Sequence, residues 1–247
     1  MDDLARQRAA QLRYWRDDAS TRPGGECAVF EGVQAHTTGL APRHWNGAHL
    51  AAPCDLGTVL PQVAAWFAVR RKSWGLLVPA ELEIRPPGMH HVTDQRVMLR
   101  EATDLPTPAL PGRLTVRWDA PAADVAGVQA EAFGDAYDTA LAFVTPQLAE
   151  GALPPQRTVT SYDGQEPVGV ATVARMDAVA GVYGVAVRER WRRHGIGAAL
   201  TAQVMAAAAA DGCDLLYLNP SDAGYGVYVS LGFRDAPPLR IWHPVEE

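Results

Sequence analysis

The sequence predicts an α/β fold, and three observations support this prediction. Apolar segments of strand length alternate along the chain with segments that have helical spacing. A glycine-containing loop at 192–197 joins one such strand to an alanine-rich helix. Three prolines between residues 105 and 112 mark a linker, after which the pattern of elements restarts. We therefore expect two domains, at 1–110 and 111–247.

The first domain is expected to contain fewer regular elements than the second. Apolar residues at helical spacing predict an opening helix at 4–18, which the glycines and proline near residue 24 end. The further elements expected here are a helix at 55–70 and strands at 27–30, 74–78, 81–84 and 96–99.

The second domain is expected to begin with a strand and two helices. The predicted helices lie at 121–133, with Asp119 as its N-cap, and at 138–150, 198–210 and 223–231. Strands are expected at 114–118, 157–162, 167–175, 179–187, 215–218 and 239–243. Asp163 and Gly164 suit the turn of a hairpin between the second and third of these strands.

The composition is that of a globular protein, with 48% hydrophobic and 20% charged residues. A net charge of −6 argues against a nucleic-acid partner. Neither a signal-peptide core nor an apolar run long enough for a membrane span is evident, so we expect a cytoplasmic protein without a membrane partner. The many Ala, Arg and Pro residues suggest a bacterial source. The three cysteines show no metal spacing and are expected to be free thiols. The histidines likewise predict no metal site.

The loop between the strand at 179–187 and the following helix has the features of an anion site. The first amides of a helix have no partner within it, and the helix dipole adds partial positive charge there. Gly195 and Gly197 remove the Cβ atoms that would keep a ligand away from these amides. Two arginines and His194 add side-chain donors, so the expected ligand is a diphosphate. The Walker and dinucleotide-binding patterns do not match, because no lysine and no third glycine follow.

What does match is Arg-x-x-Gly-x-Gly, at Arg192, Gly195 and Gly197, followed downstream by Tyr-x-x-x-Gly-Phe at 228–233. This pair of motifs resembles the GCN5-related N-acetyltransferase (GNAT) superfamily. The resemblance implies a mixed central sheet flanked by helices over 111–247. The domain at 1–110 resembles the degenerate first half of tandem members, since it lacks the glycine motif. The alternative is a separate small domain of unrelated fold.

By this resemblance the chain would use acetyl-CoA as co-substrate, without a metal. Val185 and Val187 would offer strand-edge backbone to the pantetheine arm, although both also suit an ordinary buried strand. Asn219 would touch the pantetheine or the phosphates, although it lies one position from the family's usual spacing, and Ser221 suits a helix N-cap. The residues expected to bind coenzyme A are Val185, Val187, Arg192, Arg193, His194, Gly195, Ile196, Gly197, Ala198 and Asn219.

Tyr228 is the candidate catalytic residue, because the resemblance places it near the sulfur, where a phenol could protonate the leaving thiolate. The alternative is a ring that only packs in the core. Tyr183, Glu131 and Asp135 are candidates for lining the acceptor pocket, and no residue is assigned as general base. We expect acetyl transfer to the amine of a small molecule in a ternary complex. The alternatives are a silent coenzyme A-binding module and an enzyme for another acyl-thioester. The oligomeric state is open, with a homodimer as one option.

Overall fold

The computed structural model describes residues 2–245 and divides into two compact units. Unit 1 comprises residues up to Val97 together with 235–245, and unit 2 comprises Met98–Arg234. The expected boundary at residue 110 lies within unit 2, and the C-terminal strand belongs to unit 1. Two strands cause this difference, because β5 (Met89–Glu101) and β11 (Arg234–Pro244) each cross from one unit into the other.

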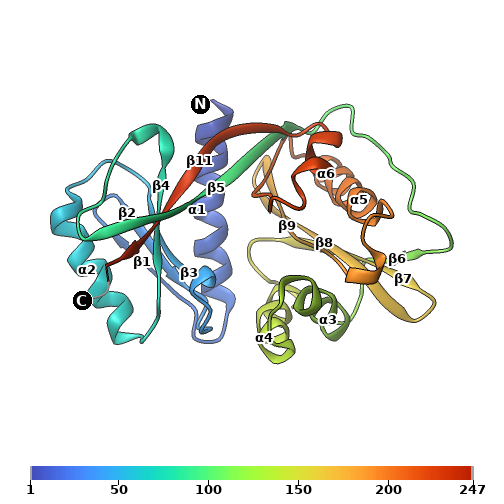
Figure 1. The fold of residues 1–247 in the computed structure, drawn as a ribbon, viewed down its shortest axis with the longest axis horizontal. Helices are drawn as coiled ribbons and strands as arrows, with labels where there is room; N and C mark the ends of the chain where they lie inside the picture. Colours follow the sequence, from blue (N-terminus) through green and yellow to red (C-terminus); the bar gives the residue numbers. More distant parts are fainter. Residues whose placement is uncertain (1, 246–247) are drawn as a thin grey trace. The chain divides into compact units, whose positions relative to one another are not determined.

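Unit 1 combines a sheet with two helices (Figure 1). Its elements are α1 (Asp3–Thr21), β1 (Glu26–Phe30), β2 (Val33–Thr37), β3 (Asn46–Leu50), α2 (Leu56–Val69), β4 (Gly75–Pro79) and most of β5 and β11. The strand order is β1-β2-β3-β4-β11-β5. β3 and β4 are parallel and are joined by α2, whereas β2 pairs antiparallel with β3 and β11 pairs antiparallel with β4.

One prediction for unit 1 was wrong, and two of its strands were not predicted. The segment expected as a strand at 81–84 instead contains a 3₁₀ turn, Ala80–Leu82, and Glu83 has a φ of +52°, which is incompatible with an extended strand. The strands β2 and β3 were not predicted, because buried polar residues such as Gln34, His36 and His49 interrupt their apolar pattern. Both strands are buried along their whole length.

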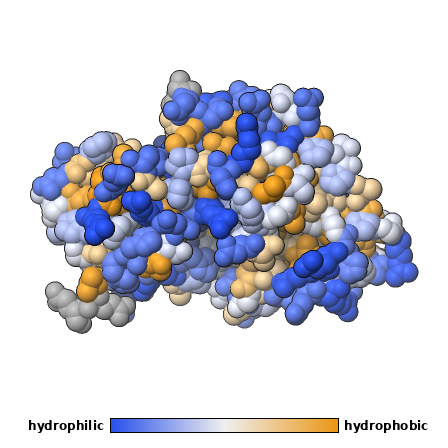
Figure 2. Space-filling view, turned by 45° about the horizontal axis from the view of Figure 1, so that its top comes forward, coloured by the Kyte–Doolittle hydropathy of each residue, from blue (hydrophilic) through white to orange (hydrophobic). Residues whose placement is uncertain are grey.

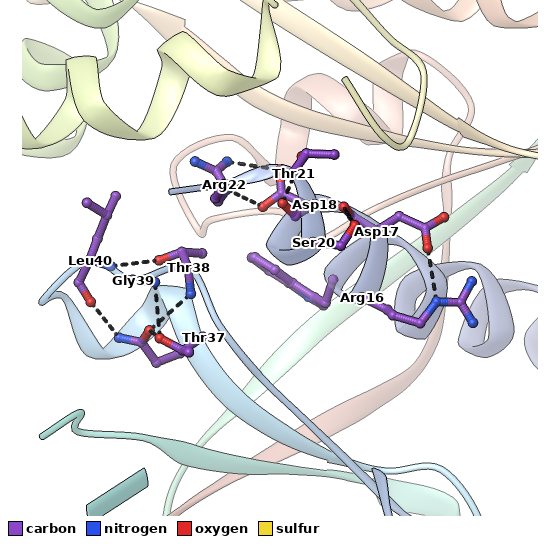
Figure 3. Close-up of polar contacts among 12 residues, drawn as sticks. Arg16, Asp17, Asp18, Ser20, Thr21, Arg22, Thr37, Thr38, Gly39 and Leu40 are labelled. Atoms are coloured by element: carbon purple, nitrogen blue, oxygen red, sulfur yellow. Dashed lines mark hydrogen bonds and ion pairs between the residues drawn. The ribbon is translucent and has the colours of Figure 1, made fainter. Parts of the chain in front are cut away.

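Polar contacts hold the end of α1 and the turn after β2 in unit 1 (Figure 3). Asp18 and Arg22 form a two-bonded ion pair with distances of 2.6 and 2.9 Å, and both side chains are 1% exposed. Nearby, Asn46 Oδ1 accepts hydrogen bonds from the Thr37 hydroxyl and from the Thr38 N–H. Loss of one partner from a buried ion pair such as Asp18–Arg22 carries a large penalty in folding free energy.

Unit 2 has a mixed sheet between two helical layers (Figure 1). Its elements are β6 (Thr115–Arg117), α3 (Ala122–Phe133), α4 (Tyr137–Gln147), β7 (Gln156–Asp163), β8 (Glu166–Met176), β9 (Val179–Val187), α5 (Ile196–Ala210), β10 (Leu215–Leu218) and α6 (Tyr225–Ser230). The strand order is β5-β10-β9-β8-β7-β6, and only β9 and β10 pair in parallel.

The two helical layers of unit 2 cover opposite faces of the sheet. Leu200 and Met205 of α5 pack with Val182 and Leu216 of the sheet in the larger apolar core. α3 and α4 pack on a second core that includes Val170 and Ala186. The predicted elements of this unit are confirmed, except that α3 begins after Pro121 without a side-chain cap, so the prediction of Asp119 as N-cap was wrong.

The surface carries no single large apolar region on the face drawn in Figure 2, where hydrophobic side chains form several separate patches among hydrophilic ones. Within residues 2–245, no helix combines the length and apolar character needed to cross a membrane.

Candidate functional site

The carboxyl end of β9 separates from its parallel neighbour in unit 2. Over the part of the chain that the structure describes, β9 and β10 pair only as far as Gly181, which lies opposite Tyr217. β9 continues beyond this point to Val187, so its edge towards β10 carries backbone groups without a strand partner. An open strand edge can form hydrogen bonds with an extended amide chain. This is the edge on which Val185 and Val187 were predicted to act.

A β-bulge lies on the same stretch of β9. Val170 pairs with Ala186, and Thr172 pairs with Tyr183, so Ala171 alone lies opposite two residues of β9, Gly184 and Val185. The extra residue reverses the alternation of the strand. Val182 before the bulge and Val185 and Val187 after it all contact the core beneath α5.

Gly184 provides the backbone conformation that the bulge requires. Its φ is +58°, in the left-handed region that favours glycine. A Cβ atom here would lie 2.5 Å from Nε2 of Gln129, a buried residue of α3 that donates a 3.4 Å hydrogen bond to the Gly184 carbonyl. Gln129 thereby fixes the orientation of the peptide at the bulge. The sequence analysis did not identify Gln129, and a polar residue within an apolar helix was the only available signal.

The loop before α5 presents unoccupied amides. Gly195, in the left-handed region with a φ of +79°, precedes the helix, and no side chain caps it. Among residues 2–245 the first α5 amide with a backbone acceptor is that of Ala199, which bonds to the Gly195 carbonyl at 3.0 Å. The N–H groups of Ile196, Gly197 and Ala198 are therefore available to a ligand, in the arrangement that binds anions.

The side chains of this loop are placed differently from its amides. The Arg192 guanidinium donates to the carbonyls of Val187 and Ala132 at 3.2 and 3.4 Å. The His194 ring lies 3.3 Å from the Trp191 carbonyl and is exposed. Arg193 has a φ of +67°, which contributes to the turn of the chain. The Arg192 and His194 side chains thus lie close to backbone carbonyls, whereas the first amides of α5 have no partner within the described residues.

The second sequence motif closes α6 with a recognisable hydrogen-bond pattern. The Phe233 N–H bonds to the Tyr228 carbonyl at 3.0 Å, and the Gly232 N–H bonds to the Val229 carbonyl at 2.9 Å. With Gly232 at a φ of +84°, these bonds form a Schellman motif. Its usual apolar contact is the edge-to-face packing of Tyr228 on Phe233, with ring centroids 6.1 Å apart. The spacing Tyr-x-x-x-Gly-Phe is therefore that of a helix end.

Tyr228 itself is largely enclosed, and burial raises the pKa of its phenol to about 12. Within the described residues its hydroxyl has no hydrogen-bond partner, while its ring contacts the main core from α6. A phenol in this state keeps its proton at neutral pH and can donate it.

In the turn before α6, the Oγ of Ser221 accepts a hydrogen bond from the Gly224 N–H at 3.2 Å. The helix begins at Tyr225 with Gly224 as its N-cap and no side-chain cap, so the prediction of Ser221 as N-cap was wrong. Asn219 follows β10 directly, at the side where β9 and β10 separate.

The remaining candidates divide into a tyrosine pair and an ion pair. The hydroxyls of Tyr183 and Tyr217 are hydrogen-bonded to each other, and both rings lie against the bare backbone of Gly181. Glu131 is engaged by Arg188 and by the Glu189 N–H. Although burial raises the pKa of Glu131, these hydrogen bonds lower it overall. Glu131 is therefore a poor general base. Among residues 2–245 no cluster of three His, Cys, Asp or Glu side chains could hold a metal.

The splayed parallel strands, the bulge and the uncapped helix all lie within unit 2. Residues 124–233 match the model of the Acetyltransferase (GNAT) family. This segment is therefore a GNAT domain, as the two sequence motifs predicted. No curated protein matches the chain.

Solved structures share the fold of the whole chain. A GCN5-related N-acetyltransferase from Kribbella flavida is 20% identical, with a TM-score of 0.76 over 100% of this chain and 97% of its own. A tandem GNAT protein from the clavulanic acid biosynthesis pathway is 13% identical, with a TM-score of 0.63 and coverage of 100% and 97%. A GCN5-related N-acetyltransferase from Sphaerobacter thermophilus is 18% identical, with a TM-score of 0.61 and coverage of 85% and 76%. The predicted mixed sheet flanked by helices is confirmed.

Proposed function

We propose that this protein transfers an acetyl group from acetyl-CoA to the amine of a small molecule. The observation that carries the proposal is the open edge of β9 beside the uncapped start of α5. One binds an extended amide chain and the other binds a diphosphate, and coenzyme A contains both groups in one molecule.

The chain's own residues would divide the binding of coenzyme A as follows. The amides of Ile196, Gly197 and Ala198 would hold the diphosphate, with Arg193, His194 and Gly195 shaping the loop. Arg192 would add charge once it leaves the carbonyls that it now contacts. Val185 and Val187 would bond to the pantetheine arm through their backbone, and Asn219 would lie beside the arm where β9 and β10 separate.

In the proposed reaction a neutral amine attacks the thioester carbonyl and forms a C–N bond, the C–S bond breaks, and the sulfur takes a proton. The proton that the amine nitrogen loses passes through solvent and restores the proton donor. The backbone N–H of Val185 at the bulge would stabilise the oxyanion. The hydrogen bond from Gln129 would keep the Gly184 carbonyl of the same peptide pointing away from that oxyanion. Tyr228 would supply the proton to the sulfur, since its phenol is protonated and unpartnered at neutral pH.

Unit 1 is proposed to be a degenerate copy of the same topology. Its β3-α2-β4 connection joins two parallel strands, as β9-α5-β10 does in unit 2. The start of α2 is closed, however, because Asp55 accepts hydrogen bonds from the Gly57 N–H at 3.0 Å and from the Thr58 hydroxyl at 2.7 Å. These hydrogen bonds, that of Thr58 first, lower the pKa of Asp55, so a carboxylate occupies the place that a phosphate would need.

Calorimetry with acetyl-CoA tests the binding step. A Cβ atom on Gly197 would lie 3.7 Å from Val187 Cγ2, and a larger side chain there would extend into the space proposed for the ligand. Gly197→Trp should therefore abolish binding. Ala206→Trp, on the exposed face of the same helix, should bind as the wild type does. Absence of binding to the wild type, or undiminished binding to Gly197→Trp, would refute the proposed site.

A panel of amines with a thiol-release assay tests the reaction. A second candidate function, a coenzyme A-binding module without catalysis, is favoured by the ion pairing of Glu131 and by the absence of an acid between Asp177 and Glu189. Binding without turnover of any amine would support this candidate. Turnover that falls strongly in Tyr228→Phe would support the enzyme.

A further inference from the structure

Arg100, near the end of β5 in unit 2, holds the carboxyl end of α6. The Nη1 atom of its guanidinium donates a hydrogen bond to the carbonyl of Leu231, the residue that follows the last turn of the helix. The last carbonyls of a helix have no donor within it. A hydrogen bond from a charged donor is stronger than one between neutral groups. Arg100 therefore fixes a carbonyl that α6 itself leaves free.

The same guanidinium also holds the chain just after β5. Its Nη2 atom donates to the carbonyls of Thr103 and Asp104 at 3.1 and 2.8 Å. Asp104 has a φ of +47°, in the left-handed region, so the chain turns at this point. β5 itself is fixed in the sheet, where Arg100 pairs with Leu216 of β10. One planar group thus ties the end of α6 to a paired strand and to the turn that follows it.

Gly232 makes room for this guanidinium. Its φ of +84° belongs to the Schellman motif and by itself favours glycine. A Cβ atom at Gly232 would in addition overlap with Nη1 of Arg100. The glycine of the Tyr-x-x-x-Gly-Phe motif therefore serves both the end of the helix and its contact with β5.

The position of Tyr228 depends on this end of α6. Within residues 2–245 its hydroxyl has no hydrogen-bond partner, so only the backbone and the packing of the ring place the phenol. The Tyr228 carbonyl accepts from the N–H groups of Leu231 and Phe233 at 3.1 and 3.0 Å. The ring packs edge-to-face on Phe233 and lies over Gly224, where a Cβ atom would be 3.1 Å from Cε2 of the tyrosine. A shift of the helix end would therefore move the phenol.

We propose that Arg100 is a positioning residue for Tyr228, and that it keeps the phenol in place beside the sulfur of the thioester during acetyl transfer. This inference rests on the proposed function, in which Tyr228 protonates the leaving thiolate. Arg100 is assigned no contact with either substrate and acts through the Leu231 carbonyl. Misplacement of a reacting group by about 1 Å can lower a rate by about 10²-fold, so a displaced helix end is sufficient to impair the reaction.

Thiol-release kinetics of the full chain, with acetyl-CoA and the amine of the panel that is turned over fastest, test the proposal. Lysine keeps the charge but not the planar fork, so Arg100→Lys should lower kcat by about tenfold or more. The KM for acetyl-CoA should stay the same, because its binding is proposed at β9 and α5. In the Tyr228→Phe background, Arg100→Lys should cause no further loss, since the phenol is absent. An unchanged kcat in Arg100→Lys, or equal losses in both backgrounds, overturns the proposal.

Arg175→Lys is the matched control. Arg175 of β8 also donates from a strand to a carbonyl at a helix end, that of Asp211 after α5, at 3.4 Å. No residue of the proposed site belongs to that end of α5, so Arg175→Lys should leave kcat unchanged. A loss of kcat as large as that in Arg100→Lys would show that loosening of unit 2 in general causes the effect, and this also overturns the proposal.

Ultraviolet titration of the Tyr228 phenol tests its position without turnover. Subtracting the titration of the matching Tyr228→Phe variant isolates this one phenol. Burial raises the pKa of Tyr228 to about 12, so in the wild type the phenol should stay protonated up to about pH 10. In Arg100→Lys water should reach the ring at the released helix end, and the pKa should fall towards the ordinary value of about 10.

The two measurements separate this inference from the proposed function. Absence of turnover in the wild type refutes the proposed function, whereas an unchanged phenol pKa in Arg100→Lys refutes the positioning by Arg100. Thermal unfolding shows whether each variant is folded. Arg100→Gln, which keeps a donor for one carbonyl but lacks the charge, has the same expected results and replaces Arg100→Lys if that variant does not fold.

Discussion

Replacement of Gly184 by alanine tests whether the bulge in β9 is built as described. A non-glycine residue in the left-handed region costs about 1–2 kcal/mol. The new Cβ would also lie 2.5 Å from Gln129 Nε2, so the side chain of Gln129 must move and lose its hydrogen bond to the Gly184 carbonyl. That loss adds about 1 kcal/mol. We therefore expect Gly184→Ala to be destabilised by about 2–3 kcal/mol, or about 4–12 °C in melting temperature for a chain of this size.

Gly164 offers a matched control for the backbone contribution. Its φ is +60°, close to that of Gly184, but a Cβ atom there would have nothing within 4 Å. Gly164→Ala therefore measures the conformational cost alone, and the excess cost in Gly184→Ala measures the contact with Gln129. In the double variant Gly184→Ala with Gln129→Ala the overlap is gone, so the double variant should be more stable than the sum of the single changes implies.

Thermal and urea unfolding of Gly184→Ala, Gly164→Ala, Gln129→Ala and the double variant supply these values, and the thiol-release assay supplies the rate. A displaced bulge would move the oxyanion donor, so kcat should fall in Gly184→Ala but not in Gly164→Ala. Equal stability losses in the two alanine variants, or additive effects in the double variant, would show that Gln129 does not contact the bulge as described.

Three further predictions concern single groups. Tyr228→Phe should lower kcat by about 10²-fold or more, with little change in stability. Because burial raises the pKa of Tyr228 to about 12, a pH–rate profile of the wild type should show no loss of kcat from ionisation of this phenol up to about pH 10. Asp18→Asn, which removes the carboxylate charge from the buried ion pair with Arg22, should cost about 3–5 kcal/mol in urea unfolding. Asp17→Asn, at a more exposed pair on the same helix, should cost less than about 1 kcal/mol. Burial lowers the pKa of His49 to about 4, so between pH 6.5 and 4 the unfolded chain binds one proton more than the folded chain. The contribution of His49 to stability should be complete above pH 6.5 and should decline as the pH falls through this window. A flat stability profile from pH 7 to 5 would contradict this burial.

The sequence was sufficient to predict the backbone geometry of the loop before α5 and of the end of α6, because local rules determine both. The glycines at 195 and 197 and the spacing of Tyr228 from Gly232 and Phe233 each encode a backbone conformation, one at the start of a helix and one at its end. Such conformations depend on neighbours within a few residues and are visible in a single sequence. The limits of β9 and β10 were predicted for the same reason, since both are short apolar runs bounded by turns.

The elements that the sequence did not reveal depend on distant partners. β2 and β3 bury Gln34 and His36, which read as surface residues until Leu12 and Trp15 of α1 are placed against them. The crossing of β11 into unit 1 depends on its pairing with β4, more than 150 positions earlier in the chain. No pattern within residues 234–244 specifies that pairing, so a boundary drawn from the proline-rich linker alone could not include it.

Gln129 shows how such a distant partner can control the proposed reaction. The bulge needs a glycine at 184, which local geometry explains, but the direction of the Gly184 carbonyl is set by a side chain 55 residues earlier on α3. If that carbonyl turned, the Val185 N–H would turn with it, since the Gly184 carbonyl and the Val185 N–H belong to one planar peptide unit. Pre-organisation of the oxyanion donor would then be lost while every motif residue stayed in place. The two motifs therefore identify where the acetyl donor would bind, whereas the contact between α3 and β9 would determine how well its carbonyl is polarised.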